Sequence, residues 1–150
     1  MTDQWLIDGC NLLRSFPGQN WYERLASFAS SKQCPCLLVL DGVGDDGEFE
    51  KYHTQFFQVI YAQGSSADCV IERTLFQNKG KASFIVVTND RTVTELATGL
   101  GSRVMKNDLF VAFLRESEDN IKTILWDEKT KSHGFNRPLD QQLKEKGFFD

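Results

Sequence analysis

Five acidic residues stand at positions from which a folded chain could bring them together. Asp8, Asp41 and Asp90 each follow a short apolar run, and Asp68 and Glu72 lie four residues apart. Residues four apart share one face of a helix, one turn above the other. Closely packed carboxylates repel one another, so a cluster of them takes up protons or a cation. The residue types therefore predict a cation site.

The chemistry expected of such a site is phosphoryl-transfer hydrolysis. Oxygen ligands without histidine or cysteine favour Mg²⁺ or Mn²⁺, which lowers the pKa of a bound water and offsets charge on the leaving oxygen. The predicted metal ligands are Asp8, Asp41, Asp68 and Asp90, and the predicted catalytic residues are Asp8, Asp68, Asp90 and Glu72. Each acid alone could be a turn residue or helix cap, so the prediction depends on the cluster.

Polar and aromatic neighbours of the acids could contact a substrate. The predicted substrate contacts are Asn11, Asn89, Arg91 and Arg14. Asn11 could instead be a neutral oxygen ligand of the metal. The two arginines could hold phosphates or be ordinary solubilising charges. Trp21 and Tyr22 could stack on bases, although core packing is the stronger expectation for Trp21.

The elements that would position these residues alternate along the chain. Strands are predicted at residues 4–7, 36–40, 56–61, 83–87 and 103–105, which are apolar runs typical of buried strands. Helices are predicted at residues 21–29, 67–77, 92–100 and 107–116, with irregular segments at 8–18 and 42–50. We also expect Asn20 with Glu23, and Thr92 with Glu95, to form capping boxes. Ser65 or Ser66 is expected to cap the helix at 67–77, and Asn107 is expected to cap the helix that runs to about residue 116.

This alternation predicts an α/β fold with a mostly parallel sheet covered by helices on both faces. Sites in such sheets lie at the carboxyl ends of the strands, where the acids are predicted to be. We expect residues 1–116 to form one domain and residues 117–150 to form an extension, with an edge strand at 121–126 and a loose tail.

Composition restricts the function classes. The chain has 150 residues and a formal net charge of −4, which argues against a broad basic surface for nucleic acid but allows a nuclease with a local basic rim. The N-terminus lacks the pattern of a signal peptide, and no apolar run approaches the roughly 20 residues of a membrane span. A cytoplasmic protein is the expectation. The four cysteines are expected to be small buried residues rather than disulfide partners.

Several motifs resemble those of one nuclease family. Residues 6–12, Leu-Ile-Asp-Gly-Cys-Asn-Leu, resemble the hydrophobic-Asp-Gly-Tyr-Asn signature of NYN-domain proteins, a branch of the PIN-like nucleases. Residues 66–72, Ser-Ala-Asp-Cys-Val-Ile-Glu, resemble the family's Thr-Ala-Asp-x-x-Ile-Glu helix, and residues 87–90 resemble its Thr-Ser/Asn-Asp strand end. The resemblance extends over residues 4–114, and the nearest branch is the YacP-like one. Cys10 departs from the pattern, which usually has Tyr there.

The resemblance implies a three-layer PIN-like fold and a metal-dependent endoribonuclease acting on single-stranded RNA. It implies acidic metal ligands at Asp8, Asp68 and Asp90, with Mg²⁺ or Mn²⁺ as the cofactor. Because the YacP-like branch includes ribosome-associated endoribonucleases, the ribosome is also an expected partner.

Other functions remain open on the sequence. A PIN-like domain could bind RNA or a protein without cutting it, and the low basicity and Cys10 favour that reading slightly. A haloacid-dehalogenase-like phosphatase needs a second aspartate two residues after its nucleophile, where Cys10 stands. A receiver domain needs an acid pair at the end of its first strand and a lysine at the end of its last strand. Of these features, Lys106 alone gives weak support. A Rossmann nucleotide site would need Gly-x-Gly-x-x-Gly after the first strand, which is absent.

Overall fold

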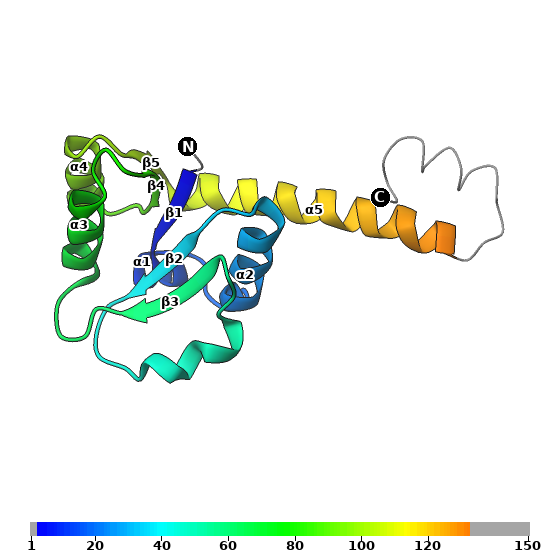
Figure 1. Cartoon of the computed structure of the whole chain (residues 1–150), viewed down its shortest axis with the longest axis horizontal. Helices are drawn as coiled ribbons and strands as arrows, with labels where there is room; N and C mark the ends of the chain where they lie inside the picture. Colours follow the sequence, from blue (N-terminus) through cyan, green and yellow to red (C-terminus); the bar gives the residue numbers. More distant parts are fainter. Residues whose placement is uncertain (1–2, 133–150) are drawn as a thin grey trace. The chain divides into compact units, whose positions relative to one another are not determined.

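Five parallel strands form the central sheet of the computed structural model, which describes residues 3–132 (Figure 1). They are β1 (Asp3–Asp8), β2 (Cys36–Leu40), β3 (Phe57–Tyr61), β4 (Ser83–Val87) and β5 (Arg103–Met105). The order across the sheet is β3-β2-β1-β4-β5, and every pairing is parallel. The predicted α/β class and parallel sheet are confirmed. Because β1 is central, the ends of β2 and β4 flank its own carboxyl end.

Helices cover both faces of the sheet, as the sequence predicts (Figure 1). The helices are α1 (Gly9–Ser15), α2 (Trp21–Lys32), α3 (Ala67–Gln77), α4 (Arg91–Gly99) and α5 (Asn107–Ser132), with a 3₁₀ helix, η1 (Asp46–Tyr52), before β3. On the α3 and α4 face, Leu6 and Val86 of the sheet pack with Ile71 and Val93 in one buried cluster. On the opposite face, Trp5 lies 5.3 Å from the Phe28 ring of α2.

The C-terminal part of the chain differs from the prediction. The helix α5 runs to Ser132, whereas the sequence predicted a helix ending at residue 116 and an edge strand at 121–126. No glycine or proline stands between Gly101 and Gly134 to interrupt a helix. The chain divides into two compact units, Met1–Val111 and Ala112–Asp150. Most of the predicted tail lies outside the described residues. No described helix combines the length and hydrophobicity needed to cross a bilayer.

Two segments predicted to be irregular are helical. The chain enters α1 directly after β1, because Gly9 lets the helix approach β2 closely. A Cβ atom at Gly9 would lie 2.7 Å from Leu40 Cδ2 and 2.8 Å from the Val39 carbonyl oxygen. After β2, Asp45 begins η1 by accepting a hydrogen bond from the Gly47 N–H at 2.9 Å. Short helices of this kind lack the long apolar periodicity by which helices are predicted.

The helix caps agree with the sequence only at α3. Ser66 Oγ accepts a hydrogen bond from the Cys69 N–H, as expected of a cap. At α4 the cap is Asp90, not Thr92, and it accepts from the Val93 N–H at 3.1 Å. At α2, Asn20 adopts the left-handed region with a φ of 52°, and its side chain makes no capping bond. The predicted capping boxes at α2 and α4 are therefore wrong.

The four cysteines are all free thiols, and their exposure is uneven. Cys36 is buried, Cys10 and Cys34 are half-buried, and Cys69 is exposed. The expectation of buried residues thus holds for Cys36 and is wrong for Cys69, which lies on the first turn of α3.

Candidate active site

Four of the predicted acids meet at the carboxyl edge of the sheet. Asp8 is the last residue of β1, Asp41 follows β2, Asp90 lies three residues after β4, and Asp68 is in the first turn of α3. The charges of Asp68 and Asp41 both raise the pKa of Asp8, and those of Asp90 and Asp41 raise the pKa of Asp68. The parallel strands therefore place these four carboxyl groups within electrostatic reach of one another.

Asp8 is the buried member of the group, with 5% of its surface exposed. Burial is the main cause of its raised pKa. Two hydrogen bonds oppose that effect: the Thr88 hydroxyl donates to Asp8 Oδ2 at 3.1 Å, and the Asn11 backbone N–H donates to the same carboxyl group. Thr88 is fully buried and fixes this carboxyl group. No role was predicted for Thr88, although it lies in the motif that follows β4.

Asp41 and Asp90 each use one oxygen to hold a helix. Asp41 Oδ1 accepts a hydrogen bond from the Ala67 N–H at 2.6 Å, where α3 begins, and Asp90 Oδ1 accepts from the Val93 N–H of α4. Carboxylates are favoured at helix N-termini, where unpaired N–H groups and the helix dipole attract negative charge. Both acids thus have the structural role that any strand-end aspartate could have, and each keeps its second oxygen for other contacts.

The carboxylate oxygens at this edge are the ligand type that a hard cation prefers. The side chains, however, are not arranged around a single ion. Burial raises the pKa of Asp68, as do the negative charges of Asp90 and Asp41, so a cation would relieve that repulsion. Among residues 3–132, however, no three acidic, histidine or cysteine side chains are close enough to hold one metal ion together. Coordination of one ion by three of these carboxylates would require them to move closer.

Glu72, the fifth predicted acid, does not join the other four. Its side chain is exposed one turn beyond Asp68, and it makes no hydrogen bond or ion pair within the described part of the chain. It is also absent from the charges that shift the pKa of Asp8 or Asp68. The helical spacing placed Glu72 on the same helix as Asp68, but α3 leads away from the strand ends.

Three asparagines join the loops around the acids. Asn11 Oδ1 accepts hydrogen bonds from the Asn89 N–H and from Asn107 Nδ2, both at 2.8 Å. Asn89 Oδ1 accepts from the Asn107 N–H at 2.8 Å, and Asn107 Nδ2 also approaches Ser15 Oγ at 3.2 Å. The amide oxygens of Asn11 and Asn89 are thus occupied, which leaves their NH₂ groups for a substrate.

Asn107 is the centre of this network and was missed as a site residue. It is fully buried, and its Oδ1 has no hydrogen-bond partner within the described residues. The sequence suggested Asn107 only as the cap of a helix. That prediction is wrong, because Asn107 is the first residue of α5 and its Oδ1 accepts no hydrogen bond within the described residues. Its contacts link the segment that follows Asp8 to the segment that contains Asp90.

The predicted basic contacts lie at the margin. Arg91 is exposed and pairs with Glu95, with Nε 3.0 Å from Oε1. Arg14 is exposed on α1, where its Nε donates to the Cys10 carbonyl oxygen at 3.4 Å. Cys10 itself borders the acids, since its Sγ accepts a hydrogen bond from the Asp41 N–H at 3.3 Å.

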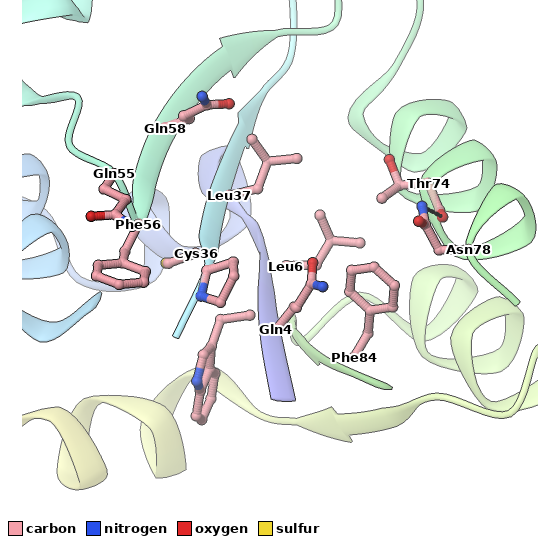
Figure 2. Close-up of a pocket in the computed structure, with 12 residues that line it drawn as sticks. Gln4, Leu6, Cys36, Leu37, Gln55, Phe56, Gln58, Thr74, Asn78 and Phe84 are labelled. Atoms are coloured by element: carbon pink, nitrogen blue, oxygen red, sulfur yellow. Dashed lines mark hydrogen bonds between the residues drawn. The ribbon is translucent and has the colours of Figure 1, made fainter. Parts of the chain in front are cut away.

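A separate hollow of about 290 Å³ lies at the other end of the sheet, near the starts of β1, β2 and β4 (Figure 2). Its floor includes Leu6, Leu37 and Phe84, and its rim includes Gln58 and Asn78. None of its lining residues is charged. It holds none of the predicted catalytic residues.

Comparison with known proteins places the chain in a family and identifies its fold. The family model described as the YacP-like NYN domain matches residues 18–147. The match includes much of the C-terminal region that the motif resemblance had left out, and it begins after the segment containing Asp8 and Cys10. No curated protein matches the chain in sequence.

Two crystal structures of Rae1 (YacP) from Bacillus subtilis share the fold. One superposes with a TM-score of 0.75 at 17% identity, covering 97% of this chain and 92% of that chain. A point mutant of the same protein gives a TM-score of 0.69 at 18% identity, covering 95% and 89%. The fold is therefore the PIN-like one that the motifs implied. With the family model matching most of its length, the chain belongs to the YacP-like NYN domain family, a family of nucleases.

Proposed function

We propose that the protein is a Mg²⁺- or Mn²⁺-dependent endoribonuclease that hydrolyses phosphodiester bonds in single-stranded RNA. The observation that carries the proposal is the buried Asp8, whose pKa is raised by burial and by the nearby charges of Asp68 and Asp41. A carboxyl group kept in such surroundings at the carboxyl edge of a parallel sheet is typical of a catalytic site. Membership of a nuclease family supplies the reaction class.

The chain's own residues would hold the metal and prepare the water. Asp8, Asp68 and Asp90 would bind the metal, with Asp41 beside them. When bound, the metal would lower the pKa of a water molecule and offset negative charge on the leaving oxygen. Asp68 is only partly exposed at the start of α3 and would orient the attacking water. Thr88 would keep Asp8 in one orientation.

Single-stranded RNA suits the charge of the molecule. With a formal net charge of −4, the chain has too little positive charge for a broad contact with duplex phosphates. Local contacts by Arg14 and Arg91, and by the NH₂ groups of Asn11 and Asn89, would suffice for an unpaired strand. We extend the proposal to a cytoplasmic setting and to RNA bound on the ribosome.

The test is cleavage of a panel of labelled single-stranded and duplex RNAs by the wild type and Asp8→Asn, with Mg²⁺, Mn²⁺ or EDTA. We expect internal cuts in single-stranded RNA that need a divalent cation, and a loss of about 100-fold or more in Asp8→Asn. Circular dichroism should show that the variant is folded. Equal cleavage by the variant, or cleavage that persists in EDTA, would contradict the mechanism.

A second candidate is RNA binding without cleavage. It is favoured by the helix-holding bonds of Asp41 and Asp90, and by the absence of any three metal-ligating side chains in reach of one ion among residues 3–132. Stable RNA complexes with no products in either metal would support this candidate.

A further inference from the structure

Four aromatic rings form a continuous row on the α2 side of the sheet. Tyr52 of η1 stacks on Tyr22 of α2 with centroids 5.3 Å apart. Tyr22 lies 4.8 Å from Phe49, and Phe49 lies 5.6 Å from Tyr61 at the end of β3. The row thus joins η1, α2 and β3. It ends at Tyr61, the last residue of β3, which lies at the same edge of the sheet as the acids.

A hollow of about 280 Å³ opens beside the Tyr52 end of this row. Its wall includes Tyr22 and Tyr52, and its rim includes Leu13 and Asn20. Asn20 stands at the N-cap position of α2, where an asparagine side chain normally accepts a bond from the helix. Here it does not, and Asn20 has no side-chain hydrogen bond within the described part of the chain. An unused amide group therefore stands at the rim of an aromatic hollow.

A series of neighbouring residues links the hollow to the acidic edge. Leu13 also lines an adjoining, more open depression with Cys10, Arg14 and Pro17. The Cys10 thiol in turn accepts a hydrogen bond from the Asp41 N–H at 3.3 Å. In addition, burial raises the pKa of Tyr22, and Glu48 and Cys10 contribute. Tyr22, which lines the hollow, is thus within electrostatic reach of Cys10.

Positive charges accompany this path. Arg14 lines the open depression, Lys51 Nζ lies 5.0 Å from the centroid of the Tyr52 ring, and Arg24 lies 4.8 Å from that of Trp21. The hollow at the opposite end of the sheet has no charged lining residue (Figure 2). Of the two, only the Tyr22 and Tyr52 hollow combines aromatic rings and an unused amide with nearby cations. Its one charged lining residue is Glu23, and the three cations lie beside it rather than in its lining.

We propose that this hollow binds an unpaired nucleobase of the RNA strand, next to the segment held at the acids. The wall formed by Tyr22 and Tyr52 would contact the base, because aromatic side chains bind bases of single strands by stacking. The Asn20 amide, with one donor and one acceptor group, would contact the base edge. Arg14 would meet a phosphate between the base and the acids. The inference deepens the proposed ribonuclease function and names Tyr52 and Asn20 as determinants of base preference.

The test uses short unpaired RNAs with one 2-aminopurine, placed at each position in turn, bound to the Asp8→Asn chain so that no strand is cut. We expect fluorescence quenching at one position. On that background, Tyr52→Leu should abolish the quenching and raise the RNA dissociation constant about 10- to 100-fold. Tyr52→Phe, which keeps the ring, should behave like the parent. The matched control is Phe76→Leu, which removes a ring 68% exposed on α3 and should change nothing.

Asn20→Ala provides a second variant that leaves the ring row intact. We expect it to reduce the difference in affinity between RNAs that differ only at the quenched base, by about three- to tenfold. The inference would be overturned if Tyr52→Leu bound RNA and quenched the fluorescence as Tyr52→Phe does. It would also be overturned if Phe76→Leu lost as much RNA affinity and quenching as Tyr52→Leu. If circular dichroism shows Tyr52→Leu to be unfolded, unchanged base preference in Asn20→Ala overturns it.

Cleavage by the wild type separates this inference from the proposed function. If a base binds against Tyr52 but the wild type cleaves no RNA, the proposed ribonuclease activity is contradicted and the nucleobase site is supported. If the wild type cleaves RNA and neither Tyr52→Leu nor Asn20→Ala changes the base preference of cleavage, the ribonuclease activity is supported and the nucleobase site is contradicted.

Discussion

At the scale of single residues, Asp8 shows how this molecule keeps an unfavourable charge. Burial raises its pKa, and the neighbouring carboxylates raise it further. The folded chain therefore holds this proton more tightly than the unfolded chain does, and ionisation of Asp8 at neutral pH costs stability. A buried carboxylate kept at a cost to stability is typical of functional sites.

Replacing Asp8 by asparagine should therefore stabilise the chain at neutral pH. We expect Asp8→Asn to raise the free energy of unfolding at pH 7 by about 0.5–2 kcal/mol in EDTA, because the amide removes the charge and can still accept the Thr88 bond. The gain should shrink as the pH falls through the raised pKa of folded Asp8 and disappear below the unfolded pKa of aspartate, where both states are protonated. Urea unfolding at several pH values measures it.

Glu72→Gln is the matched control for this prediction. Glu72 is an exposed acid on α3, so its neutralisation should change the free energy of unfolding by less than about 0.5 kcal/mol at any pH. A loss of stability in Asp8→Asn at pH 7 would show that the carboxylate is favoured in the folded state, against the direction argued from its burial.

The placement of Asp8, Asp41, Asp68 and Asp90 followed from two sequence patterns. Apolar runs ending on polar residues predicted strand ends, and a parallel sheet brings those ends to one edge. Thr88 and Asn107 were not predicted, because their roles depend on burial and on contacts between segments 80 and 96 residues apart. No local pattern reports such contacts. Whether these acids bind metal stays a prediction.

At the scale of elements, the junction of β1 and α1 shows why Gly9 follows the buried aspartate. A Cβ atom there would lie 2.8 Å from the Val39 carbonyl oxygen of the neighbouring strand, a backbone atom that cannot rotate away. We expect Gly9→Ala to lower the free energy of unfolding by about 1–3 kcal/mol, because α1 must shift away from β2. Thermal or urea unfolding measures the change.

Gly99→Ala is the matched control at the end of α4. A Cβ atom at Gly99 has no heavy atom within 4 Å, so alanine should leave the stability unchanged or raise it by up to about 1 kcal/mol. Similar losses in both variants would mean that the close approach of α1 to β2 is not what requires glycine at position 9.

The elements themselves were predictable to different degrees. The five strands were found because apolar runs in a parallel sheet have no polar face. The helices α1 and η1 were missed because they are short and are fixed by tertiary contacts such as those of Gly9. The predicted strand at residues 121–126 failed because a short apolar run fits a strand and a helix segment equally. Asn20 matched a cap in type but not in conformation.

At the scale of the whole molecule, the net charge of −4 sets how RNA can be held. Three cations of the described residues lie near the proposed RNA path: Arg14 lines the open depression, Arg24 lies against Trp21, and Lys51 lies against Tyr52. Each phosphate contact with single-stranded nucleic acid contributes about −0.7 to the slope of log K against log salt concentration. The binding should therefore depend on salt only moderately.

We expect a slope of about −2 for a short unpaired RNA on the Asp8→Asn chain, since three cations would each neutralise one phosphate. Arg14→Ala should reduce the steepness by about 0.7, because it removes one such contact. Lys79→Ala, an exposed lysine just beyond α3, should leave the slope unchanged. Fluorescence anisotropy at several salt concentrations measures all three. A slope near −5 would mean that RNA follows a wider surface than the path from the acids to Tyr52.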